Sequence, residues 1–329
     1  MRSGQNLRPE RFCESVKFGN ALECFQEKWI AVFRPETRQN NTLGSGFDSI
    51  KTGRTLGCRL LSSTFAGLAI SLALVVSGCS SDSNQLDYVE RPVETLYNIA
   101  VDKLADRNYR ESALYFDEVE RQHPYSVWAR RSMLMSAYSY YRSNKYQEAI
   151  NAAQRFIALH PGNRDAPYAY YLIAICYYEQ ISDVGRDQEM TVKALNSLQG
   201  IVRRYPQTEY SRDARIKIDM TRDHLAGKEM DVGRYYLTRG QLISAVNRFR
   251  TVVENYQTTT HVPEALHRLT ETYLTLGLTE EAQTAAAILG FNYPGSRWYQ
   301  DSYGLLVKRD LQPSEDKRSW ISRAWGTVF

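Results

Sequence analysis

The chain ends a helical pattern five times with a similar phrase, and this repetition limits the folds open to it. The five stops are centred on Pro124, Pro161, Pro206, Gln257 and Pro294. Proline cannot continue a helix, and it biases the residue before it toward extended backbone. The stops are 37, 45, 51 and 37 residues apart. The sequence therefore predicts a series of similar helical units that differ by insertions.

Three columns of residues before the stops place small and apolar side chains on one helical face. Twelve positions before each stop stand Ser112, Ala149, Ala194, Ala245 and Ala282. Eight positions before stand Phe116, Ala153, Leu198, Phe249 and Ala286, and five positions before stand Val119, Phe156, Ile201, Val252 and Leu289. A column spacing of four and three follows one face of a helix. Small residues in the first column allow a neighbouring helix to approach closely.

Each of these helices is expected to pair with an earlier, aromatic-rich helix to form a hairpin. The first helices are expected over residues 96–104, 133–141, 168–178, 229–236 and 265–276, with short polar or glycine turns after most of them. This pattern resembles the tetratricopeptide repeat. We therefore predict an all-α superhelical solenoid of about five tetratricopeptide-like helix hairpins. The longer gaps predict an insertion over 179–190 and an extra helix, over about 211–226, before the fourth hairpin.

The N-terminal part contains an apolar run at 65–76, preceded by Lys51, Arg54 and Arg59 and followed by Ser77-Gly78-Cys79. At about 1.5 Å per residue the run spans about 18 Å, which is too short to cross a hydrocarbon core of about 30 Å. The layout is typical of a secretory signal, and its end resembles the lipobox of bacterial lipoproteins. That resemblance implies cleavage before Cys79 and acylation of its thiol. The alternative is a buried helix that happens to end in Gly-Cys.

These features divide the chain into six expected parts. Residues 1–50 are an N-terminal extension, which is either disordered or the result of a start site placed too early, and residues 51–78 are the lipoprotein signal peptide. Residues 79–92 contain the lipidated Cys79 and a linker. The N-terminal repeats 1–3 follow at 93–208, the C-terminal repeats 4–5 with the extra helix at 209–311, and a loose tail at 312–329. A short docking helix at Trp320 and Trp325 is the alternative for the tail. Ser80, rather than Asp, follows Cys79, which among lipoproteins favours the outer membrane.

Charge and cysteine content narrow the classes of function. Ten of 41 Lys and Arg and six of 37 Asp and Glu precede Cys79, so the expected mature part is formally neutral. Its charge gives no reason to expect a nucleic-acid partner. Only Cys79 and Cys176 of the five Cys remain after processing. Because Cys176 lies in an apolar and aromatic run, we expect a buried thiol.

The sequence contains no recognisable catalytic constellation, so we expect a protein without cofactor, metal or enzymatic activity. No phosphate-binding glycine loop and no nucleophile elbow occur. The two closest histidines, His261 and His267, are six residues apart, on opposite faces of a helix. Asp183, Asp187 and Glu189 do not follow the pattern of a calcium-binding loop. For these residues a solvated loop is the simpler interpretation.

The aromatic first helices are the remaining candidate site. In solenoids of this kind the first helices line the concave side, and a Tyr ring offers a large contact area with a polar end. We therefore expect a peptide-binding groove that includes Tyr138, Tyr141, Tyr170 and Tyr177. Packing in the core is the alternative for any one of them, although two consecutive tyrosines cannot both point inward.

A lipobox, a polar spacer, the opening ERPVETLYNIA and five irregular repeats together resemble the BamD (ComL) family. Further similar stretches are RQHPYSVWARRSMLMSAYSYY, DAPYAYYLIAICYYEQISDVGRDQEM and TRDHLAGKEMDVGRYYLTRG. The resemblance implies a lipid-anchored scaffold of the β-barrel assembly complex on the periplasmic face of the outer membrane. Its implied partners are unfolded outer-membrane proteins, the central barrel subunit BamA and the accessory lipoproteins. Residues expected to face the partner subunit are Arg222, Asp223, Lys228, Glu229 and Arg234.

Other classes of function remain open at this point. A tetratricopeptide lipoprotein of the pilotin type, which assists secretin or pilus assembly, is the main alternative. A peptidoglycan or cell-division coordinator usually carries a coiled coil before its repeats, and no sustained heptad occurs in this sequence. An enzyme is the class that the residues favour least.

Overall fold

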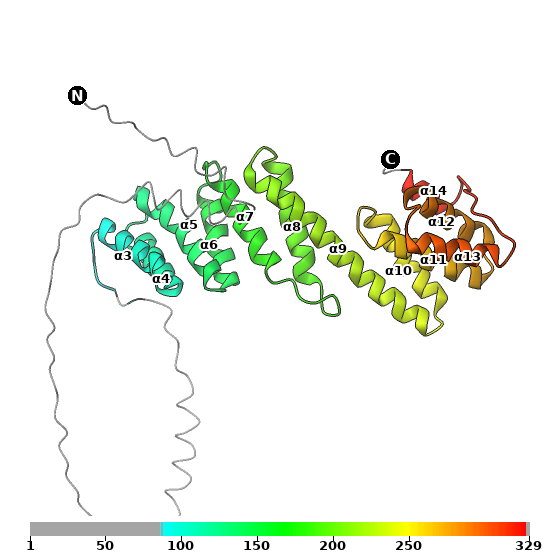
Figure 1. Ribbon diagram of the computed structural model, residues 1–329. Helices are drawn as coiled ribbons and strands as arrows, with labels where there is room; N and C mark the ends of the chain where they lie inside the picture. The colour runs from blue at the N-terminus through cyan, green and yellow to red at the C-terminus, as the bar shows by residue number, and fades with distance from the viewer. Residues whose placement is uncertain (1–85, 87, 327–329) are drawn as a thin grey trace, which may run out of the picture. The chain divides into compact units, whose positions relative to one another are not determined.

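The computed structural model describes residue 86 and residues 88–326, and all regular structure in that part of the chain is helical. The helices have the bounds Val93–Ala105 (α3), Tyr109–Gln122 (α4), Val127–Arg142 (α5), Tyr146–Leu159 (α6), Ala166–Tyr178 (α7), Glu189–Arg204 (α8), Glu209–Thr238 (α9), Leu242–Asn255 (α10), Val262–Leu276 (α11), Thr279–Asn292 (α12), Arg297–Val307 (α13) and Trp320–Trp325 (α14) (Figure 1). The expected signal peptide, its Cys79 and the extension at 1–50 lie outside the described residues.

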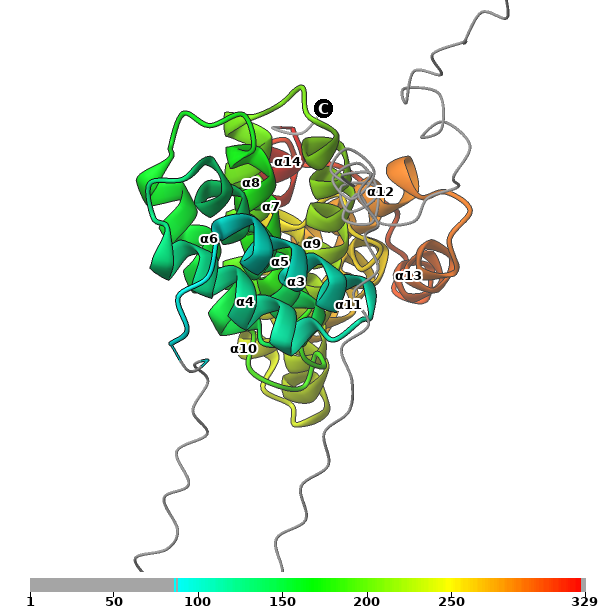
Figure 2. The same ribbon diagram turned by 90° about the vertical axis from the view of Figure 1, so that its left-hand side faces the viewer.

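The helices belong to one compact unit that begins at Arg91, and within it each helix packs on the next. Five hairpins form in order: α3 with α4, α5 with α6, α7 with α8, α9 with α10 and α11 with α12. The first helices also contact one another, α3 with α5, α5 with α7 and α7 with α9. Seen from the side of α3 and α4, the later helices lie behind the earlier ones (Figure 2). The predicted all-α solenoid of tetratricopeptide-like hairpins is confirmed.

Four hairpin turns share one backbone geometry. Each contains a residue in the left-handed region: Arg107 and Asn144 at φ 60°, Gly240 at φ 70° and Gly277 at φ 80°. In each turn the next N–H donates to a carbonyl five residues earlier, at 2.9 or 3.0 Å, as in Asn108 to Lys103. This is the Schellman arrangement, which satisfies carbonyls at the end of a helix. The predicted turns are thus confirmed, and they return the chain in the same way each time.

The five stops also share one geometry. The residues that cap the second helices, namely His123, His160, Tyr205, Tyr256 and Tyr293, have φ between −135° and −129°. The carbonyl of each accepts a hydrogen bond of 3.0 to 3.2 Å from the N–H three residues later. The fourth stop has Gln257 in place of proline and keeps the same bond. Proline is therefore not required for the geometry of the stop.

The predicted packing columns form the centre of the solenoid. All fifteen of their residues are at most 1% exposed. Ser112, the one polar member, donates its hydroxyl to the Ala100 carbonyl at 2.9 Å. Close packing of a small first column against bulkier ones removes this whole face from water, which is the main source of stability in such a repeat.

The prediction that a separate extra helix precedes the first helix of the fourth hairpin is wrong. One helix, α9, runs without interruption through 30 residues. It contains no proline, and its two glycines are buried against neighbouring elements: a Cβ on Gly233 would lie 2.5 Å from the Phe249 ring, and one on Gly227 would lie 3.2 Å from His261 Nε2. The helix continues because its first part packs on α8 and its second part packs on α10.

The C-terminal part also differs from the expectation of a loose tail over 312–329. Residues 320–325 form α14, which packs on α10 and α12 and buries Ile321 completely. The Trp320 ring nitrogen donates to the Tyr273 hydroxyl at 3.1 Å. Burial of the apolar side chains holds this segment, so the alternative of a short docking helix is confirmed. Helix α13, which packs on α11 and α12, was not among the elements expected from the sequence.

Candidate functional site

The expected groove tyrosines divide into one core residue and three surface residues. Tyr138 is 1% exposed, so its assignment to the groove is wrong. It lies in the buried run 132–139 of α5, a helix that contacts α3, α4, α6 and α7 and so has little free surface. Arg142 donates to the Tyr138 hydroxyl at 2.9 Å. Tyr138 is therefore a packing residue with its polar end satisfied.

Tyr141, Tyr170 and Tyr177 are partly exposed, as a binding surface requires. The Arg204 guanidinium lies 4.8 Å from the centre of the Tyr170 ring, and the Tyr205 ring lies 5.8 Å from it. Burial raises the pKa of Tyr141 above its ordinary value, so its hydroxyl stays protonated and can donate. These three tyrosines present ring surface on the first helices α5 and α7. Their use by a peptide remains a prediction.

Two carboxylates that the sequence did not single out hold the neighbouring tyrosines. Asp117 of α4 accepts from the Tyr140 hydroxyl at 2.6 Å and from Ser136, and Asp213 of α9 accepts from Tyr171. Burial raises the pKa of Asp117, while the hydrogen bonds from Ser136 and Tyr140 oppose that rise. These tyrosine hydroxyls are occupied by internal partners. For Asp117 the sequence did contain a signal, because this carboxylate lies between the packing positions Phe116 and Val119.

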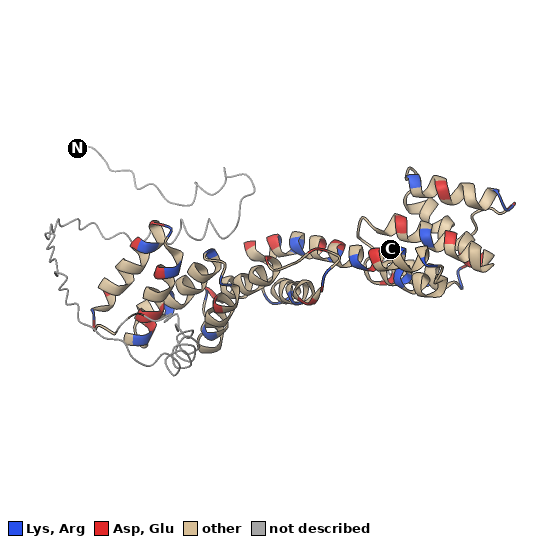
Figure 3. Ribbon diagram, turned by 90° about the horizontal axis from the view of Figure 1, so that it is seen from below, with Lys and Arg blue, Asp and Glu red and all other residues tan. Residues whose placement is uncertain are grey.

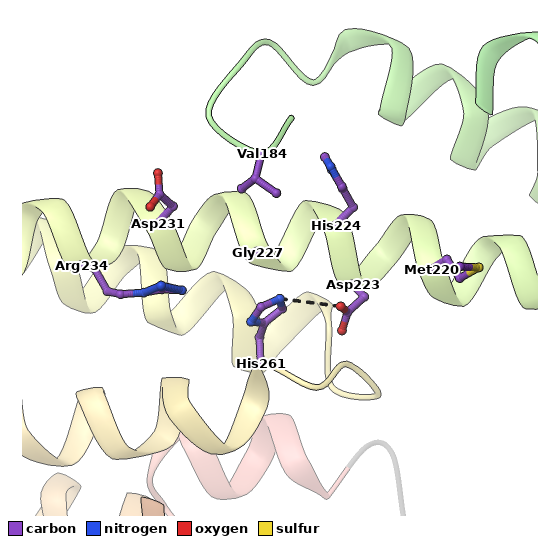
Figure 4. Close-up of a pocket in the computed structure, with 8 residues that line it drawn as sticks. All are labelled: Val184, Met220, Asp223, His224, Gly227, Asp231, Arg234 and His261. Atoms are coloured by element: carbon purple, nitrogen blue, oxygen red, sulfur yellow. Dashed lines mark ion pairs between the residues drawn. The ribbon is translucent and has the colours of Figure 1, made fainter. Parts of the chain in front are cut away.

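A pocket of about 320 Å³ lies beside the middle of α9 (Figure 4). Val184 of the insertion covers it from one side, His261 from the start of α11 lies opposite, and Gly227 lies between them. Asp231 and Arg234 lie toward one end, and Met220, Asp223 and His224 toward the other. The pocket combines apolar walls with charges of both signs. That composition suits a polypeptide segment better than a single ion.

Two of the five expected partner-facing residues line this pocket, and Asp223 has the most internal contacts. Its carboxylate accepts from the Thr260 backbone N–H at 2.9 Å and from the Thr260 hydroxyl at 2.7 Å. His261 Nε2 lies 3.7 Å from the same carboxylate. Asp223 thereby joins α9 to the connection between α10 and α11.

The other expected partner-facing charges are also engaged within the chain. Lys228 donates to the Gly185 carbonyl at 3.1 Å, which ties the insertion to α9. Glu229 pairs with Arg248 at 3.1 Å, and Arg234 lies 3.4 Å from Glu264. Arg222 is half-buried. These contacts give the charges a positioning role inside the unit, and a role toward a partner subunit stays a prediction.

The surface of the unit mixes charges, with Lys and Arg interspersed among Asp and Glu along the helices (Figure 3). Among the described residues, no group of three or more His, Cys, Asp or Glu could hold a metal ion. No described helix is long and apolar enough to cross a membrane. Cys176 is completely buried, as expected, and burial raises the pKa of its thiol to about 12. That thiol is protonated and shielded from solvent.

Comparisons with known proteins agree with this architecture. The sequence profile of a family described as "Outer membrane lipoprotein" (YfiO) matches residues 89–288. The chain is 55% identical over 248 residues to the outer membrane protein assembly factor BamD of Caulobacter vibrioides, covering 75% of this chain and 81% of that protein. It is 43% identical over 235 residues to the BamD of Rickettsia prowazekii, covering 71% of this chain and 93% of the relative.

The family match spans more than half of the chain, and it includes the five hairpins up to the middle of α12. The relatives are covered over most of their own length. The resemblance inferred from the motifs is confirmed. The chain is therefore a member of the outer membrane lipoprotein family that includes the BamD assembly factors.

Proposed function

We propose that this protein is the lipid-anchored scaffold of a β-barrel assembly complex at the periplasmic face of the outer membrane. The observation that carries the proposal is the 55% identity over 248 residues to a protein named outer membrane protein assembly factor BamD. An open stack of hairpins with exposed aromatic rings supports it. The names of the relatives favour this function over that of a pilotin for secretins or pili.

In this proposal the first helices α5 and α7 receive a segment of an unfolded barrel protein. Tyr141, Tyr170 and Tyr177 supply ring surface, and the hydroxyls of such rings can bond to the open edge of an extended segment. The C-terminal repeats bind the central barrel subunit, and accessory lipoproteins complete the complex. Asp223, Lys228, Glu229 and Arg234 hold the shape of the surface offered to that subunit. No step requires a cofactor or a catalytic residue.

Depletion of the protein from its cells tests the proposal. The amount of folded, heat-modifiable barrel proteins in the outer membrane should fall as the protein is lost, and pull-down through a C-terminal tag should recover a barrel protein with tandem periplasmic domains. A complementing copy should restore the folded barrels. Normal barrel levels after complete depletion, or recovery of a secretin in place of the barrel protein, would overturn the proposal.

The anchor has a separate test. Cys79→Ser should leave an unprocessed precursor or a mislocalised chain, because the thiol that carries the acyl group is lost. The mass of the processed protein measures this directly. An unchanged mass and unchanged membrane retention would refute lipidation at Cys79 without touching the role in barrel assembly.

A further inference from the structure

Three connections of the solenoid lie at the same end of the helices. Because consecutive helices alternate in direction, the α4–α5, α6–α7 and α8–α9 connections share one edge, opposite to the hairpin turns (Figure 1). We call residues 121–131, 159–165 and 203–212 the connection edge. The first two parts adjoin, since Asp165 lies within electrostatic range of Arg130 and Arg131. In the third part, the Tyr205 ring lies 5.8 Å from that of Tyr170 on α7, the helix that follows the second part.

The connection edge is basic and its charges are largely uncompensated. It contains seven arginines against two acids, a formal excess of +5, whereas the expected mature part as a whole is formally neutral. Five of these arginines are exposed and have no carboxylate oxygen within 4.0 Å among the residues that the structure describes: Arg130, Arg164, Arg203, Arg204 and Arg212. Arg121 of the edge pairs with Glu118. Exposed arginines without such a pair also occur singly elsewhere in the described part of the chain, as at Arg186 and Arg239, but the connection edge gathers five of them. Unpaired guanidinium groups are suited to phosphate.

Exposed apolar side chains accompany these arginines. Tyr125 in the α4–α5 connection is 101% exposed, Val127 at the start of α5 is 59% exposed, and Leu159 at the end of α6 is 57% exposed. Tyrosine beside arginine, with isolated aliphatic side chains, is a composition typical of protein surfaces at a membrane–water interface. The edge therefore resembles a surface that meets lipid headgroups rather than bulk water.

The chain joins the helical unit at this edge. The Arg91 N–H donates to Gln122 Oε1 at 3.1 Å, and the Arg91 carbonyl lies 2.9 Å from His123 Nε2. Both partners belong to the connection edge. Cys79 precedes Arg91 by twelve residues, a length of chain that reaches at most about 40 Å when extended. An acyl group on Cys79 would hold the edge at high effective concentration near the bilayer.

We propose that the connection edge rests on an anionic phospholipid surface and so fixes how the solenoid is oriented beneath its membrane; this rests on the proposed lipidation of Cys79. The arginines bind headgroup phosphates, and Tyr125, Val127 and Leu159 enter the interfacial layer. The acyl anchor holds the chain at the bilayer but does not fix its orientation, and attraction between a basic surface and anionic lipids adds to that anchoring. Each arginine near the surface contributes about fivefold to partitioning, and salt weakens the effect.

The test uses the processed protein from the envelope, attached to vesicles of phosphatidylcholine alone or of phosphatidylcholine with phosphatidylglycerol. Hydrogen–deuterium exchange is measured for peptides covering the connection edge and for the hairpin turns. We expect exchange at the edge to slow by about fivefold or more on the anionic vesicles only, and this slowing to disappear at high salt. The hairpin turns should exchange alike on both kinds of vesicle.

Two matched variants accompany the protein itself. One changes the five exposed edge arginines to Gln: Arg130, Arg164, Arg203, Arg204 and Arg212. The other makes the same change in charge elsewhere, at Arg186, Arg239, Lys308, Lys317 and Arg323, all exposed. The edge variant should lose the slowing and the control variant should keep it. Because the vesicle comparison uses the unaltered protein, a variant that fails to fold does not decide the outcome.

Three results would overturn the proposal. If the protein attaches to both kinds of vesicle and exchange at the connection edge is the same on both, the anchor is supported and the contact between the edge and anionic lipid is refuted. If the edge variant and the control variant lose the slowing of exchange equally, the slowing depends on total charge and not on the connection edge. Protection of the edge in the intact envelope but not on vesicles assigns it to a protein partner instead. Failure to attach even to phosphatidylcholine vesicles is a different result, which contradicts the proposed anchor.

Discussion

Asp223 on α9 accepts both the backbone N–H and the hydroxyl of Thr260, at 2.9 and 2.7 Å. The two residues are 37 positions apart in the sequence. One carboxylate thus links the long helix shared by the two halves of the repeat series to the start of the fifth hairpin. His261 lies beside the same carboxylate, 3.7 Å away. The surface next to the pocket is therefore set by this link.

Asp223→Ala should destabilise the C-terminal repeats. Two hydrogen bonds to a charged acceptor are lost, but the carboxylate is 38% exposed, so we expect a decrease of about 1 kcal/mol in the free energy of unfolding. Urea denaturation followed by tryptophan fluorescence measures it. Asp219→Ala is the control, since Asp219 is exposed on the same helix one turn earlier. Equal stabilities of the two variants would contradict the role of the link.

Gly233→Ala should also destabilise the unit. The added Cβ would lie 2.5 Å from the Phe249 ring, in a position where both residues are buried. Overpacking of this kind costs about 1–3 kcal/mol. Gly200→Ala is the matched control: it lies within α8 with nothing inside 4 Å of the new Cβ, so it should stabilise by about 0.5–1 kcal/mol through helix propensity. Chemical denaturation measures the change in the free energy of unfolding for each variant. Changes of opposite sign confirm the prediction, and changes of the same sign refute it.

The end of the solenoid should lose stability in mild acid because of His267. Its Nδ1 lies 2.9 Å from Ser302 Oγ, and burial, followed by the nearby Arg268, lowers its pKa. The unfolded chain then binds the proton more readily than the folded one. The stabilisation is present above an unfolded pKa of about 6.5 and is lost as the pH falls through the lower folded value.

Thermal denaturation of the wild type and of His267→Gln, at pH values from about 7 to about 5, measures this contribution. The difference between the two proteins isolates the histidine from the carboxylates that titrate in the same range. We expect the wild type to lose more stability than the variant over this interval. A parallel decline of both proteins would show that protonation of His267 does not matter.

Tyr138 and Tyr177 should respond differently to alanine. Tyr138 is 1% exposed, so Tyr138→Ala should cost about 3–5 kcal/mol of stability through the cavity it leaves. Tyr177 is partly exposed on α7, and Tyr177→Ala should cost less than about 1 kcal/mol while weakening the binding of an unfolded barrel segment. Denaturation and fluorescence titration with a labelled barrel peptide measure the two effects. If Tyr177→Ala binds the labelled peptide as tightly as the wild type, Tyr177 is not part of the peptide-binding groove.

The sequence predicted burial correctly where the same pattern of small and apolar residues recurred on one face of successive helices. The columns headed by Ser112 and Phe116 are buried in the structure because a period of 3.6 residues turns them toward the same neighbours. It was less informative where a residue's environment depends on several helices at once. Tyr138 and Tyr141 are separated by one helical turn, yet only the first is enclosed: four other helices contact α5, and the buried run of that helix ends at residue 139.

The helical class, the five hairpins, their turns and stops, and the family could all be predicted from the sequence. They depend on local periodicity, on backbone restrictions and on an ordered set of motifs, which involve residues close together in the chain. Only the folded unit shows that α9 is continuous, that α14 docks on α10 and α12, and which tyrosines and charges are enclosed. Those outcomes depend on the burial of side chains from segments far apart in the sequence. No local pattern contains that information.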